Sequence, residues 1–266
     1  MENNKFLPSD LMSSSPNRLT EASRRLIPKV IHYCWFGSKP FSRTIRKCIA
    51  TWHKYLSDYE FCLWNEETCA TYAAAHNLPN PMEHPFVKGA YAAKKYAFVA
   101  DYVRFWALYH CGGVYLDTDM YVVRSFDDLL GSDFFCAWET FESTNELTQN
   151  RIVSCGIIGA SVNNLTILQV LNKYNAFVFN ANDVGQFIVT RIVTPIILDD
   201  LNNKIYSYDY FYPLPYQERF IWQKMKYNTE NTYAVHLWDI SWGKWQAKMK
   251  DQIIFILRKF IRKSKK

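Results

Sequence analysis

Two aspartates, Asp117 and Asp119, end the sequence Gly-Gly-Val-Tyr-Leu-Asp-Thr-Asp at positions 112–119. If this run is a β-strand, the two carboxylates point to the same face, because side chains alternate along a strand. Two acids on one face at a strand end form an oxygen-rich corner, which suits a hard divalent cation that keeps positions open for phosphate oxygens. Taken alone, Asp-Thr-Asp would favour an ordinary solvated strand end, and it is the surrounding sequence that favours a metal site.

The segment before the glycines, residues 87–111, has the composition of one long helix that stops at Gly112-Gly113. Asp101 and Arg104 lie at i and i+3, on one face of that helix. On a solvated surface such a pair contributes on the order of a few tenths of a kcal/mol. This helix is almost wholly apolar and is therefore expected to be buried, where an ion pair is costly unless it is well satisfied. The cost favours a functional role for the pair.

Three blocks of sequence resemble glycosyltransferase family 32. They read Ile-Pro-Lys-Val-Ile-His-Tyr-Cys-Trp-Phe-Gly (27–37), Tyr-Ala-Phe-Val-Ala-Asp-Tyr-Val-Arg (96–104) with Gly-Gly-Val-Tyr-Leu-Asp-Thr-Asp (112–119), and Ala-Val-His-Leu-Trp (234–238). The family includes bacterial capsular-polysaccharide transferases, yeast initiating mannosyltransferases and animal α-galactosyltransferases. The glucosylating domains of large clostridial toxins share the same arrangement. The three blocks in this order are specific, whereas a lone Asp-x-Asp is not.

The order of elements predicts an α/β fold. Apolar runs at 29–35 and 59–64 are typical of strands, and residues 42–54 and 66–76 have helical spacing. In the second half we expect strands at 154–160 and 232–238 and helices at 165–174 and 186–198, with Pro195 kinking or ending the last one. This alternation indicates a Rossmann-like, mostly parallel sheet flanked by helices, with smaller irregular C-terminal elements. The family resemblance implies the same layout, the GT-A type.

The chain of 266 residues is long enough for one large domain. No apolar run reaches about 18 residues, so no transmembrane helix is expected. We predict a flexible lead at 1–26, a catalytic domain at 27–245 and a basic amphipathic tail at 246–266. The lead lacks the apolar core of a signal peptide. The seven cysteines are scattered and form no Cys-x-x-Cys pair, which favours reduced thiols and a cytoplasmic location.

The net charge of +6 is concentrated at the C-terminus. Residues 251–266 hold six basic residues and one acid, a net of +5, so the rest of the chain carries only +1. We therefore expect no nucleic-acid partner. A basic helix with an apolar face suits an anionic membrane surface, and it equally suits a terminal helix docked on the domain.

The resemblance implies roles for the residues of the first two blocks. Trp35, at the end of a strand, is expected to stack on the nucleobase, and Tyr115 to flank the same base or the ribose. Asp101 and Arg104 match residues that hold hydroxyls of the donor sugar, and Arg104 also offers positive charge near the phosphates. His32 and His53 carry no such warrant and are interpreted as structural residues.

The metal site is expected to involve both acids and the third block. Asp119 is predicted to bind Mn²⁺ or Mg²⁺ directly, and Asp117 to reach the ion partly through water while it contacts ribose or sugar hydroxyls. The resemblance implies that His236 contacts the metal or a phosphate, although a lone histidine on an apolar strand is more often structural. It also implies that Trp238 contacts the diphosphate or a lid over it.

These features together predict a metal-dependent glycosyltransferase that moves a hexose from a nucleotide-diphosphate sugar to a glycan or lipid-linked acceptor in capsular or other surface polysaccharide synthesis. The family resemblance implies that the anomeric configuration is retained. A UDP-hexose is favoured as the donor, with GDP-mannose as the alternative. No covalent nucleophile stands out, so a same-face displacement assisted by the leaving phosphate is the working hypothesis. Two other classes stay open: a secreted effector that glycosylates a host protein, and a non-catalytic sugar-nucleotide binding module. Cys155-Gly156 and Gly185-Gln186 depart from the family pattern at positions where sugar or acceptor contacts are expected.

Overall fold

The structure is a computed structural model that describes residues 26–139, 152–220 and 223–239. The predicted basic tail at 246–266, and all of the predicted N-terminal lead except Leu26, lie outside the described residues.

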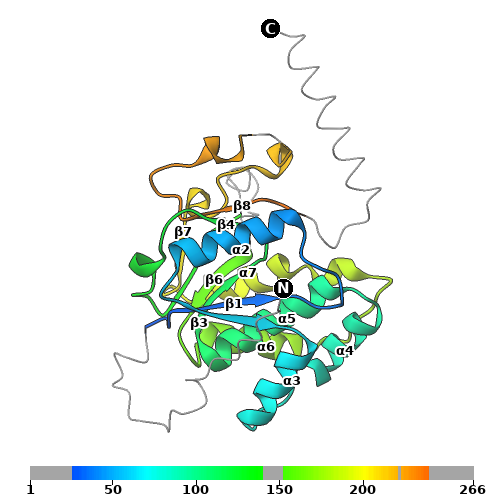
Figure 1. Ribbon diagram of the computed structural model, residues 1–266. Helices are drawn as coiled ribbons and strands as arrows, with labels where there is room; N and C mark the ends of the chain where they lie inside the picture. Colours follow the sequence, from blue (N-terminus) through cyan, green and yellow to red (C-terminus); the bar gives the residue numbers. More distant parts are fainter. Residues whose placement is uncertain (1–25, 140–151, 221–222, 240–266) are drawn as a thin grey trace.

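A six-stranded sheet forms the centre of the molecule (Figure 1), with strand order β2-β1-β3-β6-β5-β7. Strand β6 runs antiparallel to both of its neighbours, and the other pairings are parallel. The predicted mostly parallel α/β sheet is therefore confirmed. The strands of this sheet are β1 (Val30–Cys34), β2 (Glu60–Trp64), β3 (Gly113–Leu116), β5 (Phe134–Trp138), β6 (Val153–Ala160) and β7 (Lys204–Tyr206).

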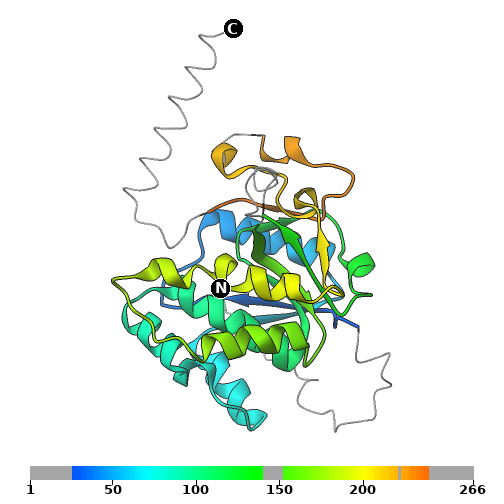
Figure 2. The same cartoon turned by 180° about the vertical axis from the view of Figure 1, so that it is seen from behind.

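Helices cover both faces of the sheet (Figures 1 and 2). Helix α2 lies on one face, and α5 and α6 lie on the other, with α7 packed against α6 and β6. The α-helices are α2 (Arg43–Tyr55), α3 (Glu66–Ala75), α4 (Pro85–Ala92), α5 (Tyr96–Cys111), α6 (Leu165–Tyr174) and α7 (Val189–Asp199). Short 3-10 helices are η1 (Pro81–Glu83), η2 (Asp127–Leu129), η4 (Val184–Phe187), η5 (Tyr208–Tyr210), η6 (Tyr216–Glu218) and η7 (Lys224–Tyr227).

Alternation along β3 divides the core between the two faces. Val114 and Leu116 pack with Trp52 of α2 in one apolar cluster, while Tyr115 packs with α5 in the other. The side chains of a strand alternate in this way because successive Cβ atoms point to opposite faces. Tyr115 is consequently directed toward the helix that carries Asp101 and Arg104.

A separate two-stranded ribbon lies beside the sheet. Strand β4 (Met120–Val122) pairs antiparallel with β8 (Ala234–His236), so that Met120 is opposite His236. Helix α2 secures this ribbon, because the Trp52 indole donates a hydrogen bond to the Met120 carbonyl at 2.7 Å. The described residues after β7, yellow to orange in Figure 1, lie over the ribbon.

The prediction of one helix over residues 87–111 is wrong. The helix is broken into α4 and α5 at residues 93–95, where Lys94 adopts a left-handed φ of 55°. The Lys95 N–H returns to the Ala90 carbonyl at 2.9 Å, which is the closing hydrogen bond of a helix C-terminus. Because alanine, lysine and tyrosine all favour helices, local composition gave no sign of the break.

The expectation that Asp117 and Asp119 lie on a strand is also wrong. Strand β3 ends at Leu116, and the Asp-Thr-Asp sequence forms a turn in which the Met120 N–H donates to the Asp117 carbonyl at 3.0 Å. The two carboxylates still converge, but they do so because the turn redirects the chain into β4. The alternation of side chains along a strand, on which the prediction of a shared face rested, is therefore not the cause of this convergence.

His32 joins β1 to the end of α5. It is completely buried; its Nε2 donates to the Gly112 carbonyl at 2.6 Å, and its Nδ1 accepts from the Trp64 indole at 3.0 Å. Gly112 and Gly113 both have positive φ, and a Cβ on Gly113 would lie 2.6 Å from the Val30 carbonyl oxygen. The glycine pair therefore allows α5 to turn directly into β3, and the histidine holds that turn.

The seven cysteines are all buried and form no disulfide, as the sequence predicted. Among the described residues, no helix combines the length and apolar character that crossing a membrane would require.

Acid should weaken the fold through His32. Burial lowers the pKa of His32 to about 4, below its ordinary 6.5, so the folded protein keeps the ring neutral. The unfolded chain takes up a proton below pH 6.5, so stability is lost as pH falls from about 6.5 to 4, by up to about 3 kcal/mol. Urea unfolding across this range should show a steeper loss for the wild type than for His32→Gln. The exposed His53, changed to Gln, is the control, and equal pH slopes for His32→Gln and wild type would contradict the prediction.

Candidate metal and sugar-nucleotide site

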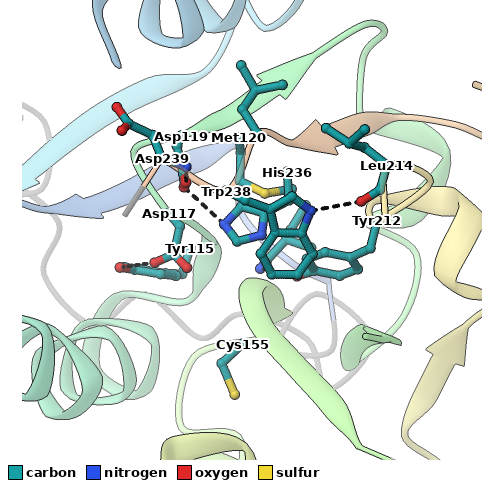
Figure 3. Close-up of polar contacts among 12 residues, drawn as sticks. Tyr115, Asp117, Asp119, Met120, Cys155, Tyr212, Leu214, His236, Trp238 and Asp239 are labelled. Atoms are coloured by element: carbon teal, nitrogen blue, oxygen red, sulfur yellow. Dashed lines mark hydrogen bonds and ion pairs between the residues drawn. The ribbon is translucent and has the colours of Figure 1, made fainter. Parts of the chain in front are cut away.

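Asp119 is held by residues 236–239, here called the C-terminal strap. The Leu237 N–H donates to the Asp119 carbonyl at 3.1 Å, and His236 Nε2 lies 3.0 Å from Asp119 Oδ1. The Asp239 N–H donates to Asp119 Oδ2 at 2.7 Å. The pairing of β4 with β8 brings the strap to this place, because it sets Met120 opposite His236. Asp119 is therefore fixed at its backbone and at both carboxylate oxygens (Figure 3).

Asp117, Asp119 and His236 converge on one point. One ligand atom from each lies within 4.8 Å of the others, and His236 Nδ1 is buried without a hydrogen-bond partner among the described residues. Two carboxylates and one imidazole form a donor set of the kind that binds a divalent cation. The three residues that the sequence predicted as metal ligands therefore lie together and fit such an ion.

Asp119 and His236 influence each other's charge. Burial raises the pKa of Asp119, but the adjacent His236 and the Asp239 N–H outweigh burial, and the pKa lies below its usual value. Burial lowers the pKa of His236, but the Asp119 carboxylate outweighs it, and that pKa is raised. The pair is thus stabilised with Asp119 ionised and His236 protonated. An ionised Asp119 is what metal binding requires, whereas a metal ion bound by His236 would displace the proton of that ring, because histidine binds metals in its neutral form.

The predicted Asp101–Arg104 pair lies beneath Asp117. Arg104 Nη2 is 2.6 Å from Asp101 Oδ1, Nη1 donates to the Cys155 carbonyl at 2.7 Å, and Nη1 is 3.5 Å from Asp117 Oδ1. The guanidinium lies over the Tyr115 ring, 4.5 Å from its centroid. Burial raises the pKa of Asp101 to about 7, even though Arg104 favours its ionised form. The pair is satisfied, as a buried ion pair must be.

Tyr115 supports Asp117 from below. Its hydroxyl donates to Asp117 Oδ1 at 2.9 Å, and the residue is only 2% exposed. The ring therefore offers little surface for stacking on a base, and its contact with the site passes through the hydroxyl. The Arg104 side chain is similarly only 6% exposed, so its main contacts are with the protein.

Trp35 follows β1 at the same edge of the sheet. Its indole N–H donates to the Lys39 carbonyl at 2.7 Å, and its ring meets Phe41 edge-on at 4.9 Å, which leaves it half-buried. Strand β1 pairs in parallel with β3, His32 opposite Tyr115, so this strand end lies beside the end of β3 that leads into Asp117. Stacking of Trp35 on a nucleobase stays a prediction.

Trp238 covers His236 in the strap. Its φ is 55°, its indole donates to the Leu214 carbonyl at 2.8 Å, and its ring centroid is 4.1 Å from that of His236. A left-handed conformation in a bulky residue costs on the order of 1–3 kcal/mol and is found mainly at functional sites. Figure 3 shows the indole against the imidazole at the centre of the cluster.

Tyr212 belongs to the site but was not predicted. Its hydroxyl accepts from the Ile157 N–H at 2.9 Å, and its ring meets the His236 ring edge-on at 5.7 Å. A Cβ on Gly156 would lie 3.1 Å from both the Tyr212 hydroxyl and Asp117 Oδ2. Tyr212 thus links the strand beside Asp117 to the histidine. The sequence gave no signal for it, because it is one of several aromatics in the segment 206–216.

Cys155 contributes its backbone to the site. Its carbonyl accepts the Arg104 hydrogen bond, while its side chain packs in the apolar cluster on the α5 face. Figure 3 shows the thiol directed away from His236. The other departure from the family pattern, at Gln186, lies in η4, where the exposed side chain contacts Asp183.

Parts of the chain are similar in sequence to known proteins. Residues 42–135 match the family model described as a glycosyltransferase sugar-binding region containing DXD motif. Over 158 residues the chain is 29% identical to inositol phosphoceramide mannosyltransferase 3 of Schizosaccharomyces pombe, a match that covers 58% of this chain and 39% of that protein. Mannosyl phosphorylinositol ceramide synthase CSH1 of Saccharomyces cerevisiae is 29% identical over 114 residues, which are 41% of this chain and 27% of that protein. The chain thus spans less than half the length of these curated relatives.

A solved structure described as PaToxG glycosyltransferase shares the fold. It matches with a TM-score of 0.50 and 19% identity, over 66% of this chain and 71% of that chain. The fold is therefore of the GT-A type. This solved structure bears on the fold alone, whereas the family match assigns residues 42–135 to a glycosyltransferase sugar-binding region containing DXD motif. The relatives matched by sequence are named as an inositol phosphoceramide mannosyltransferase and a mannosyl phosphorylinositol ceramide synthase, and neither name mentions a capsular polysaccharide.

Removal of one ligand should weaken metal binding. We expect Asp119→Asn to lower the affinity for Mn²⁺ by roughly tenfold or more, since loss of even a supporting group at a metal site has an effect of that size. Titration of free Mn²⁺ by electron paramagnetic resonance measures the affinity directly. The exposed Asp128, changed to Asn, is the matched control, and unchanged affinity in Asp119→Asn would remove Asp119 from the metal site.

The Asp101–Arg104 pair should show strong coupling in a double-mutant cycle. Arg104→Met leaves the Asp101 carboxyl buried without its cation and should destabilise the protein by about 3–5 kcal/mol. The double variant with Asp101→Leu removes the stranded acid as well and should be less destabilised than Arg104→Met alone. Urea unfolding measures all four proteins. Additive losses would show that the two side chains act independently.

Proposed function

We propose that this protein is a metal-dependent, retaining glycosyltransferase. It transfers a hexose from a nucleotide-diphosphate sugar to a hydroxyl of a glycan or lipid-linked acceptor. The observation that carries the proposal is the convergence of Asp117, Asp119 and His236 in a GT-A fold, directly above the buried Asp101–Arg104 pair. A protein that has lost its enzymatic activity is expected to lose buried charged residues, because they are costly to keep. Here each of these charged side chains has a partner.

Each residue has a defined task in this proposal. Asp117, Asp119 and His236 hold a divalent cation, which when bound offsets negative charge on the diphosphate. Asp101 and Arg104 fix the positions of Asp117 and the Cys155 carbonyl, and through them the sugar. Trp35 stacks on the nucleobase, and Trp238 closes the strap over the diphosphate.

The reaction breaks the bond between the anomeric carbon and the phosphate oxygen. The acceptor hydroxyl forms its new bond on the same face that the phosphate leaves, and the departing phosphate oxygen accepts the hydroxyl proton. The leaving diphosphate gains negative charge as the bond breaks, so stabilisation is most effective at that end of the substrate. The carboxylates and the imidazole would supply this stabilisation through the divalent cation that they hold.

The relatives narrow the substrate classes. Their names describe mannose transfer to inositol-containing ceramide lipids, which supports a GDP-mannose donor and a lipid acceptor for this chain. The proposed UDP-hexose donor and surface-polysaccharide acceptor rest on the family resemblance. The proposed catalytic domain, residues 27–245, contains the whole site. We further propose that the enzyme is cytoplasmic and that its tail at 246–266 contacts the inner face of the membrane.

The donor can be named by binding alone. In a thermal-shift panel of UDP-, GDP-, TDP- and CMP-sugars, we expect one nucleotide to raise the melting temperature by several degrees only when manganese is present. The same shift should be absent from Asp119→Asn. A shift without metal would contradict the metal site, and no shift with any nucleotide would overturn the proposed donor site.

The acceptor separates the proposal from its rivals. With the donor found above, transfer to a lipid-linked glycan or glycolipid supports the proposal. Transfer to protein only would make the chain a protein-modifying effector, and binding without transfer or hydrolysis would make it a non-catalytic module.

A further inference from the structure

Besides the proposed cation, a diphosphate bound at this site needs positive charge from side chains other than Arg104 and His236. Asp101, Asp117 and Asp119 carry carboxylates, and Arg104 and His236 are their partners. Arg104 makes hydrogen bonds to Asp101 and to the Cys155 and Ala100 carbonyls, and it is almost completely buried. Its guanidinium therefore has little left for a diphosphate, although the sequence suggested such a role.

Lys224 lies close to the strap. It begins η7, and its ammonium donates to the Leu237 carbonyl at 3.5 Å. Leu237 is the residue whose N–H donates to the Asp119 carbonyl. The Lys224 ammonium therefore contacts the same residue, Leu237, that holds the backbone of Asp119.

The environment of Lys224 leaves its charge available. The side chain is half-buried beside an apolar cluster that includes Cys48, Leu214 and Leu237. Burial lowers the pKa of Lys224, while the negative charges of Asp239 and Asp119 favour its charged form. Its hydrogen bond among the described residues is the long one to Leu237. An ammonium has three N–H groups, so two remain for another acceptor. Because lysine acts as a compact, mobile point charge, it is suited to phosphate oxygens.

We infer that Lys224 binds the diphosphate of the nucleotide-sugar donor and offsets its charge as it leaves. The inference rests on the proposed function, because it assigns one more contact to the same site. The diphosphate would then contact both the cation held by the metal-binding residues and a lysine from η7. Leu237 links the two parts of the site, because it contacts both Asp119 and Lys224.

Binding of nucleotides in the presence of Mn²⁺ tests this assignment. UDP, GDP and the matching nucleosides are titrated by calorimetry into wild type, Lys224→Met and Lys224→Arg. We expect Lys224→Met to bind the preferred nucleoside diphosphate about tenfold more weakly, the loss of one charge-assisted contact, with nucleoside binding unchanged. Lys224→Arg should recover part of the affinity. Lys226→Met is the control, since Lys226 is exposed two residues away and lies over the Tyr227 ring.

Two further readouts separate the possible failures. Free Mn²⁺ affinity and the thermal midpoint of Lys224→Met should match wild type, which shows that the metal site and the fold are intact. Equal diphosphate affinity in Lys224→Met and wild type overturns the inference. The inference is also overturned if Lys224→Met keeps its diphosphate affinity and only the KM for a phosphate-bearing acceptor rises, because Lys224 then binds the acceptor. If wild type binds no nucleotide, it is the proposed function that fails.

Discussion

The guanidinium of Arg104 joins the three elements on which the site is built. From α5 it reaches Asp101 on its own helix, Asp117 after β3 and the Cys155 carbonyl of β6, and it lies over Tyr115. Removing such a group from water costs several kcal/mol, so it is stable only where every contact is made. That requirement fixes the distance between the helix and both strands. The position of Asp117 follows from it.

A second constraint comes from the far end of the chain. The β4–β8 ribbon brings the strap to Asp119, and hydrogen bonds from the strap occupy its carbonyl and both carboxylate oxygens. The strained backbone of Trp238 is held by its indole hydrogen bond and by its contact with His236. The site is thus assembled from a preformed base, made by α5, β3 and β6, and a strap that must dock on it. Any chemistry here depends on both parts.

Much of the fold could be predicted because its signals are local. Ser42 accepts from the Ile45 N–H and starts α2 where the sequence placed a helix, and Gly112-Gly113 ends α5 as expected. The break at Lys94 was missed because its residues favour helix, and only packing decides between a continuous and a broken helix there. The Asp-Thr-Asp turn was missed because alternation in a strand and convergence in a turn both bring two acids together.

By itself, the sequence determined which residues carry charge, the approximate bounds of α2, α3 and α6, and that Asp101, Arg104, Asp117, Asp119 and His236 are the candidates for chemistry. Only the tertiary structure decided how they divide the work. Arg104 and Tyr115 are turned inward as supports, and Tyr212 and Lys224 enter from segments with no motif. The reason is physical. Spacing along the chain specifies which neighbours share a face, whereas contacts between residues more than a hundred positions apart, such as Asp119 and His236, exist only once strands β4 and β8 have paired.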